Sequence, residues 1–393
     1  MAEKEKKKRN WPGILSMALY MPVGVMGGLM MLKYMERVGA FDFEPMKKYL
    51  FVVLFIACVY LSIYVDIILH EAGHLIFGLI SGYRFVSFRI GSLTLWRDEN
   101  GKLRLGVMKI AGTGGQCLMA PPDMVDGKIP VVLYNLGGCI VNAVAGAVML
   151  ITYFLLGSEV TLLSVCLIIA ALFNFAVCLT NGIPMNTAMI ANDGKNALQL
   201  GRDPTALRAF WLQLKINEQQ TLGVSLRDMP ADWFEMPADE DMKNTLVAAI
   251  GFIAAGRLID EGRYAEADAA MAHLLEGSFG LIGVHRYMLV CERMFFEIIG
   301  ENRPAVLDAM RTPEQLKFMK MMRTSPSVIR AEYAYATLTD FDEKRAGELE
   351  KLFEKCAARY PFAAEIETER RLWALVQARV NNREKPDGNG EES

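Results

Sequence analysis

The chain has 393 residues, and its 42 lysine and arginine residues nearly balance 45 aspartate and glutamate residues, for a formal net charge of −3. A charge this small carries none of the basic excess of a nucleic-acid-binding protein, and we expect no nucleic-acid partner. Hydrophobic residues make up 52% of the chain and the mean hydropathy is +0.21, which predicts that part of it lies in a membrane. The seven cysteines are odd in number and scattered, so no disulfide framework is expected.

Four apolar segments are long enough to span a bilayer. They cover residues 11–32, 49–80, 129–156 and 160–180, with a mixed-charge loop expected over 33–48. The first segment is laid out like a signal peptide, but it is too long and lacks a clear cleavage site. Residues 1–10 are basic, so the positive-inside rule predicts a cytosolic N-terminus. Four spans then return the chain to the cytosol, as in a multi-pass cell-membrane protein.

The segment 82–128 interrupts the membrane part and reads as a small β insertion. Residues 83–90, 93–96 and 103–110 are rich in strand-forming types, and Asp98-Glu99-Asn100-Gly101 predicts a hairpin turn. Several arginines and lysines favour a cytosolic position. Residues 112–117 are expected to be a flexible loop, and the glycine-rich stretch 112–115 within it is a possible gate. Cys117 follows it, either as a zinc or redox contact or, more simply, as a small apolar residue.

Residues 201–380 are soluble in character and predict a cytosolic domain of helical hairpins. The expected helix pairs are 244–260 with 262–274, 293–300 with 305–310, and 329–337 with 343–356. The spacing of small and apolar residues over 262–274 is tetratricopeptide-like. Residues 381–393 are polar and expected to be disordered. The fold class is therefore mainly α: a membrane helix bundle over 11–200 with a β-hairpin insertion, followed by this helical domain.

The second apolar segment contains His70-Glu71-Ala72-Gly73-His74. Two histidines four residues apart lie on one face of a helix and can bind one Zn²⁺, while Glu71 can activate water. The alternative is a pair of surface histidines on an ordinary helix, but the flanking residues are too apolar for a solvent-exposed face. Asp66 lies one turn earlier. It could orient an imidazole or fill a structural, water-lined position.

A catalytic zinc needs three protein ligands and one open position. A candidate third ligand, Asp193, follows the fourth apolar segment, although Asp193-Gly194 could equally be a turn or a helix cap. The other two histidines, His273 and His285, lie in the soluble half and are expected to be packing or surface residues.

The pairing of H-E-x-x-H with Asn181-x-x-Pro184 and Asp193-Gly194, and with Gly138-x-x-x-Asn142, resembles the site-2 protease family of intramembrane zinc metalloproteases. The resemblance covers roughly residues 49–200. It implies that His70, His74 and Asp193 are the zinc ligands and that Glu71 is the general base. Two departures stand out: Pro184 and Asp193 are nine residues apart, wider than the common pattern, and Cys139 replaces the usual proline.

Together with this resemblance, these residues predict a zinc endopeptidase, and the resemblance implies that it cleaves single-span membrane proteins. Asn142 and Asn181 could hold the extended substrate or the developing oxyanion, or could instead satisfy backbone groups. A helical substrate must unwind first, and the β insertion could pair with it by strand addition. The helical domain would bind substrates or a protein regulator. The alternatives are an inactive relative that acts as a membrane adaptor, and, less well matched, a transporter with a metal pathway.

Overall fold

The computed structural model describes residues 11–42, 45–98, 100–107, 114–157, 159–186 and 191–384, without the side chains of 45–48 and 383–384. The described residues contain fourteen α-helices and four β-strands. The chain divides into two compact units, which we call the apolar unit (1–91 and 114–204) and the helical unit (92–113 and 205–393). Each is described by itself.

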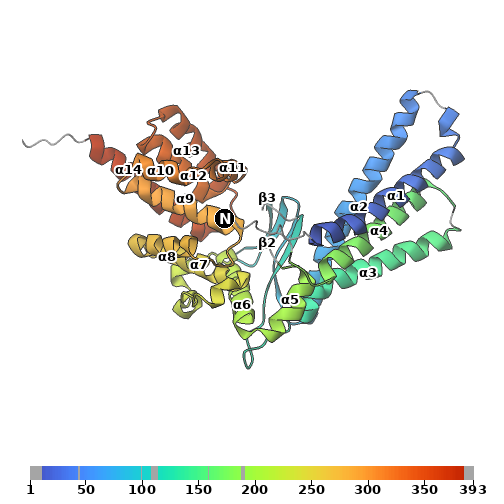
Figure 1. Ribbon diagram of the computed structural model, residues 1–393, viewed down its shortest axis with the longest axis horizontal. Helices are drawn as coiled ribbons and strands as arrows, with labels where there is room; N and C mark the ends of the chain where they lie inside the picture. The colour runs from blue at the N-terminus through green and yellow to red at the C-terminus, as the bar shows by residue number, and fades with distance from the viewer. Residues whose placement is uncertain are drawn as a thin grey trace, which may run out of the picture. The chain divides into compact units, whose positions relative to one another are not determined.

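Four long helices make up most of the apolar unit: α1 (Trp11–Arg37), α2 (Pro45–Ile80), α3 (Val132–Leu155) and α4 (Leu162–Gly182). Figure 1 shows them side by side, with α3 packed on α2 and α4, and α1 packed on α4. All four are long and apolar enough to cross a membrane, which confirms the four predicted segments by length and composition. Many apolar side chains on their outer faces are exposed, such as Val53, Leu61 and Val148, as expected of surfaces that face lipid.

The predicted loop over 33–48 is wrong at both ends. α1 continues to Arg37, because no glycine or proline lies between Lys33 and Arg37 to end it. The chain turns only at Gly39, whose φ of +68° is readily adopted by glycine, before the short 3-10 helix Ala40–Asp42. α2 then begins at Pro45.

A disulfide joins Cys58 of α2 to Cys166 of α4, contrary to the expectation that the cysteines form no bridge. The two residues are 108 positions apart, in separate apolar segments, so no spacing pattern connects them in the sequence. Their pairing depends on the packing of the two helices. The other five cysteines are free.

In the apolar unit, β1 (Arg84–Ile90) pairs antiparallel with β4 (Gly115–Ala120), from Arg84 opposite Ala120 to Ile90 opposite Gly115. In the helical unit, β2 (Leu93–Arg97) pairs antiparallel with β3 (Leu103–Val107), which confirms the predicted hairpin around Gly101. The prediction of a flexible loop is wrong for Gly115 and Cys117, which are paired with β1. Residues 108–113, including the start of that predicted loop, lie outside the described residues.

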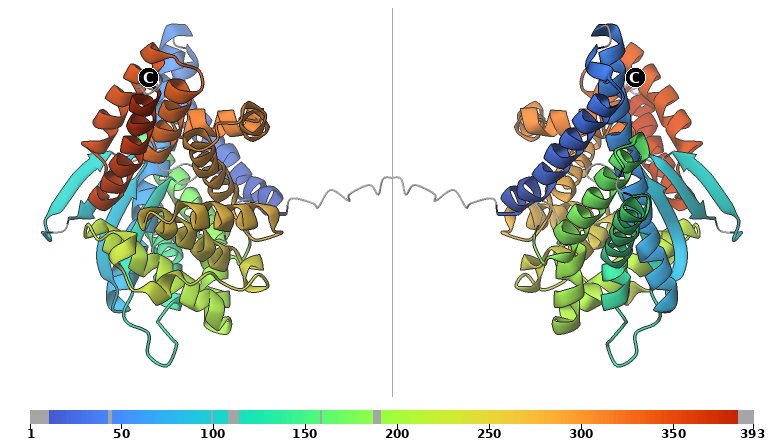
Figure 2. Two further views of the ribbon diagram at one scale, coloured as in Figure 1. Left: turned by 90° about the vertical axis from the view of Figure 1, so that its left-hand side faces the viewer. Right: turned by 90° about the vertical axis from the view of Figure 1, so that its right-hand side faces the viewer.

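The rest of the helical unit is a series of packed helices, coloured green-yellow to red in Figure 2. α7 packs on α8, and α12 packs on α9, α13 and α14. Their bounds are α6 (Pro204–Thr221), α7 (Thr245–Asp260), α8 (Tyr264–Glu276), α9 (Gly283–Ile299), α10 (Pro304–Met310), α11 (Pro313–Met321), α12 (Pro326–Leu338), α13 (Glu343–Ala357) and α14 (Ala363–Glu384). The three predicted helix pairs are present, but the predicted start at 293 is wrong: α9 begins at Gly283, because residues before 293, such as Leu289 and Cys291, are also buried.

Three helices of this region, α6, α11 and α14, were not predicted. α14 also corrects the expected disordered tail, since it runs to Glu384; residues 385–393 lie outside the described part. α14 is highly charged, yet it buries Ile366, Leu372, Trp373 and Val376 at helical spacing. Tertiary packing of this narrow stripe stabilises the helix.

Candidate metal centre

Helix α2 carries His70, Glu71 and His74, and all three side chains are buried. Their burial depends on a close approach of α3. A Cβ added at Gly73 would lie 2.3 Å from the carbonyl oxygen of Gly137, so the two backbones meet at glycines. Gly138 leaves room for the His70 ring, because a Cβ there would lie 2.5 Å from its Cε1.

The third candidate ligand, Asp193, is the first residue of α5 (Asp193–Gln199). Asn192 fixes the start of this short helix. Its side-chain oxygen accepts from the backbone N–H of Lys195 and of Met185, and its side-chain nitrogen donates to the carbonyls of Thr180 and Ile183. The next residue, Gly194, packs directly on the end of α4, since a Cβ there would meet the carbonyl oxygen of Gly182. These contacts hold Asp193 beside α4.

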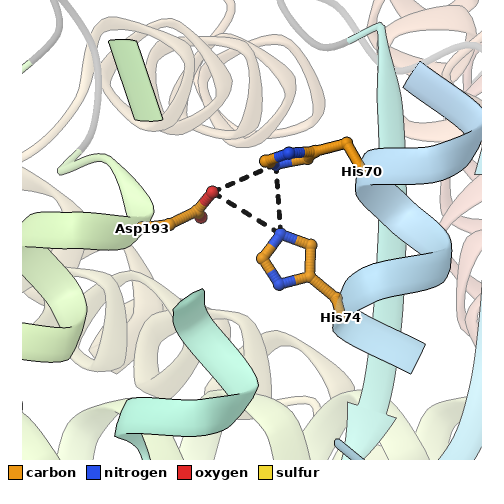
Figure 3. A group of neighbouring side chains, drawn as sticks. All are labelled: His70, His74 and Asp193. Atoms are coloured by element: carbon orange, nitrogen blue, oxygen red, sulfur yellow. Dashed lines mark hydrogen bonds and ion pairs between the residues drawn. The ribbon is translucent and has the colours of Figure 1, made fainter. Parts of the chain in front are cut away.

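The three side chains converge on one point (Figure 3). Nε2 of His70 lies 3.1 Å from Oδ2 of Asp193, and Nε2 of His74 lies 3.5 Å from the same oxygen. The two Nε2 atoms are 3.2 Å apart. Ligand atoms about 2.0–2.1 Å from a tetrahedral zinc are separated by roughly 3.3–3.4 Å, so these distances match one triangular face of such a site.

The hydrogen bonds of the two rings explain why this point suits a cation. Nδ1 of His70 lies 2.7 Å from Oδ1 of Asn142, and Nδ1 of His74 lies 2.8 Å from the carbonyl oxygen of Tyr134. Both partners are acceptors, so each ring carries a proton on Nδ1 and, when neutral, a lone pair on Nε2. Two lone pairs and a carboxylate oxygen would repel one another in a buried site, and a bound cation satisfies all three.

Asn142 is fully buried and is held in turn by other side chains. Its Nδ2 donates to Oδ1 of Asp66 at 2.7 Å and to Oδ1 of Asn174 at 2.8 Å. The amide therefore presents its oxygen to His70. Such outer hydrogen bonds fix the tautomer and orientation of a histidine that binds metal.

Glu71 lies on the next position of α2 and contacts β4. Its Oε1 would lie 2.7 Å from a Cβ added at Gly115, and the backbone of Cys117 donates to its carboxylate. Cys117 itself is buried and is not one of the described residues that converge on the possible metal position, which favours the small apolar interpretation of Cys117.

The structure thus brings His70, His74 and Asp193 together and connects Asp66 to His70 through Asn142 rather than directly. The side chain of Asn142 hydrogen-bonds to His70, Asp66 and Asn174, and its contact with a substrate stays a prediction. Asn181 is partly buried, and its side chain makes no hydrogen bond to any residue the structure describes. His285 stacks on Phe252, and His273 pairs with Asp239, both in the helical unit.

Two residues of the site were missed by sequence reasoning. Asn174 lies inside the fourth apolar segment, where a polar residue that faces a neighbouring helix is itself a signal. Asn192 precedes Asp193 at a helix start, where asparagine is a preferred cap, so its position could have been predicted.

Fold and site together define a protein with four apolar helices of membrane-spanning length and a buried His-His-Asp group that could hold a metal ion. Comparisons of the chain with protein-family models, with curated proteins and with solved structures find no match. The functional argument therefore depends on the site itself.

Proposed function

We propose that the chain is an intramembrane zinc endopeptidase of the site-2 protease type. It hydrolyses a peptide bond in or near the membrane-spanning segment of a single-span membrane protein. One observation carries the proposal: three acceptor atoms converge beside the Glu71 carboxylate, on helices whose outer faces are apolar. Ionisable groups at such positions are costly and usually functional.

Each residue has a part in this proposal. Nε2 of His70, Nε2 of His74 and a carboxylate oxygen of Asp193 would bind Zn²⁺, which when bound supplies Lewis-acid activation of water and of the scissile carbonyl. Glu71 accepts the proton of the attacking water and passes it to the leaving amine. Asn142 and the Tyr134 carbonyl keep the histidine protons on Nδ1, so that both Nε2 atoms stay available.

Strand β4 offers a place for the unwound substrate. It pairs with β1 along one edge and lies next to the Glu71 carboxylate. An extended peptide added to its other edge would satisfy its own amide groups while it passes the site. The helical unit, which we propose is a cytosolic tetratricopeptide-like array, would bind substrates or a regulator, with both chain termini in the cytosol.

Replacement of Glu71 tests the catalytic role. We expect Glu71→Gln to keep about one zinc ion per chain, as measured by mass spectrometry of the purified protein, because Glu71 is not a ligand. Proteolysis should fall at least roughly 100-fold, because loss of a general base costs about that much. The readout is quantitative proteomics of membranes that contain the wild type or the variant, followed for the single-span protein that is cut only by the wild type.

Glu159→Gln is the matched control, since Glu159 is exposed and pairs with Arg37. It should cleave like the wild type. If Glu71→Gln cleaved at the wild-type rate, the proposed catalytic role of Glu71 would be refuted. If the wild-type protein bound no zinc and cleaved no membrane protein, the alternative of an inactive membrane adaptor would be favoured.

A further inference from the structure

The helical unit contains a cavity of about 270 Å³ between α7, α9, α12 and α14. One side is apolar and includes Phe252, Met288 and Leu372. The polar side brings together one arginine and several carboxylates from these helices. Apolar walls with a few convergent polar groups are typical of binding sites.

Arg330 of α12 lies on the polar side and is 1% exposed. Its Nη2 donates to both carboxylate oxygens of Glu292, at 2.6 and 2.8 Å, and its Nε donates to Glu369 at 2.6 Å. Its Nη1 is buried and makes no hydrogen bond to any described residue. Arg330 is therefore held in the wall of the cavity mainly by Glu292 and Glu369.

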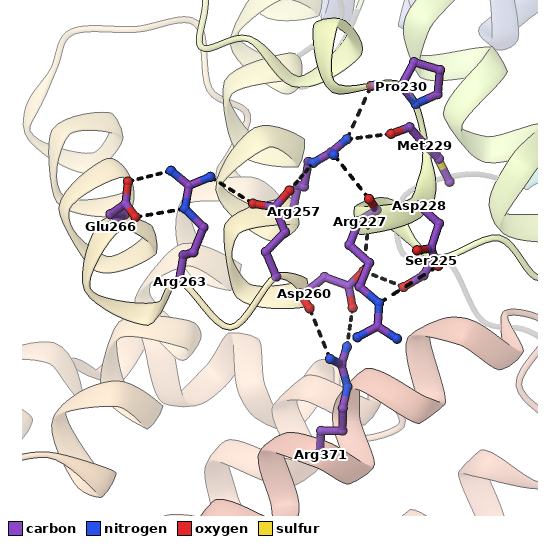
Figure 4. Close-up of polar contacts among 11 residues, drawn as sticks. Ser225, Arg227, Asp228, Met229, Pro230, Arg257, Asp260, Arg263, Glu266 and Arg371 are labelled. Atoms are coloured by element: carbon purple, nitrogen blue, oxygen red, sulfur yellow. Dashed lines mark hydrogen bonds and ion pairs between the residues drawn. The ribbon is translucent and has the colours of Figure 1, made fainter.

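Asp260 also lines the cavity, but its carboxylate is already saturated (Figure 4). It accepts from the hydroxyls of Ser225 and Thr368, from the backbone N–H of Arg227 and from Arg371. Asp260 of α7 therefore connects to α14 through its bonds to Thr368 and Arg371, and it is not available to a ligand.

Glu365 differs from Asp260. The Tyr360 hydroxyl donates to it at 3.0 Å and is its one hydrogen-bond donor among the described residues. Glu292, Glu365 and Glu369 together face a single cation, Arg330, because Asp260 is balanced by Arg371. When ionised, the three carboxylates leave a negative excess that repels an anion and attracts a cation.

We infer that this cavity binds a lysine or arginine side chain of a partner protein segment. The aliphatic stem lies along the apolar wall, and the cationic group pairs with Glu365. Stacked helical hairpins commonly bind extended protein segments. The inference does not depend on the metal centre or on proteolysis.

Short capped peptides test this inference on the purified full chain. The probe is acetyl-Gly-Gly-Lys-Gly-Gly-amide, and its Kd is measured by saturation-transfer NMR. We expect saturable binding of this peptide and of its arginine version. Versions with norleucine or glutamate in place of lysine should bind at least about tenfold more weakly, because they lack the cation. Equal binding of the norleucine version would overturn the inference, as would absence of saturable binding of both basic peptides.

Two variants locate the site. Glu365→Gln should weaken lysine-peptide binding about tenfold, whereas Glu367→Gln, an exposed position on the same helix, should leave it unchanged. Ala364→Leu, also at the cavity, should block binding by filling space, and it serves as a second test if Glu365→Gln does not fold. Unchanged binding in folded Glu365→Gln or Ala364→Leu protein would refute the assignment.

Discussion

Asn142 shows how one amide can decide what two histidines do. Its Oδ1 accepts the Nδ1 proton of His70, while its Nδ2 is held by Asp66 and Asn174. If the amide were reversed, its N–H groups would face His70 Nδ1 and the ring would have to move its proton to Nε2. The polar chain from Asp66 to His70 therefore selects the tautomer that can bind a metal.

Replacement of Asn142 separates this role from a substrate contact. We expect Asn142→Ala to weaken zinc affinity roughly 10- to 100-fold, because outer hydrogen bonds to a metal-binding histidine are worth about that much. Competition with a fluorescent zinc chelator measures the affinity. Asn181→Ala is the control and should bind zinc like the wild type. A raised KM with unchanged zinc affinity in Asn142→Ala would instead support the substrate contact predicted from the sequence.

Among the residues of the site, the sequence spacing by itself predicted only those that one helix places together. The i, i+4 histidines with Glu71 could be predicted because one helix face brings them together. Asn174 could not be assigned to this site, because its partner Asn142 is 32 residues away and only the packing of α3 on α4 joins them.

Among the elements, α2 and α3 meet through glycines at the level of the candidate metal centre. Gly73 and Gly137 bring the backbones together, and Gly138 gives the His70 ring its space. A helix pair this close has no room to shift, so the position of His70 is set by the packing of the two helices as much as by its own hydrogen bonds.

A single methyl group tests this packing. In Gly138→Ala the new Cβ would lie 2.5–2.8 Å from atoms of the His70 ring, so the ring must shift from its present position. We expect zinc affinity to fall at least tenfold, with proteolysis falling in parallel, because a ligand displaced from its position binds poorly. Gly24→Ala in α1 is the control, since nothing lies within 4 Å of its added Cβ. Wild-type zinc affinity in Gly138→Ala would show that the ring can adjust.

Elements were predictable where hydropathy or turn chemistry was strong. The four apolar helices and the β2–β3 hairpin follow from such signals. β4 was missed because its glycine-rich approach resembles a loop, whereas its pairing with β1 joins residues about thirty positions apart. α14 was missed because its apolar stripe is narrow and its charged residues dominate the composition.

At the scale of the whole molecule, the two units differ in which ionisable groups they bury together. The candidate metal centre places two histidine rings against one carboxylate, while the cavity of the helical unit surrounds one arginine with glutamates. The division itself was only partly predictable. The sequence suggested a break near residue 200, but not that the 92–113 segment groups with the helical unit, because that grouping depends on tertiary contacts.

The buried Glu365 should make the stability of the full chain depend on pH. Burial, together with the charges of Glu369 and Glu292, raises the pKa of this carboxyl to about 7, although the Tyr360 hydroxyl opposes the shift. Below about pH 4.5 the carboxyl is protonated in both the folded and the unfolded chain, so it does not change the free energy of unfolding. Between about pH 4.5 and 7 only the unfolded chain releases the proton, so the free energy of unfolding falls as pH rises.

In Glu365→Gln the amide side chain does not titrate. The free energy of unfolding of this variant should therefore not fall with pH in the way that the buried Glu365 causes in the wild type. Relative to the wild type, we expect its Tm to be nearly equal at pH 5 and higher by several degrees at pH 8, for a difference of at most roughly 3 kcal/mol. Differential scanning fluorimetry of the full chain at both pH values measures it, with Glu367→Gln as the exposed control. A Tm difference that stays constant from pH 5 to pH 8 would show that Glu365 titrates normally. The carboxyl would then be ionised at pH 7 without penalty, and the cavity would hold a permanent rather than a pH-dependent negative charge.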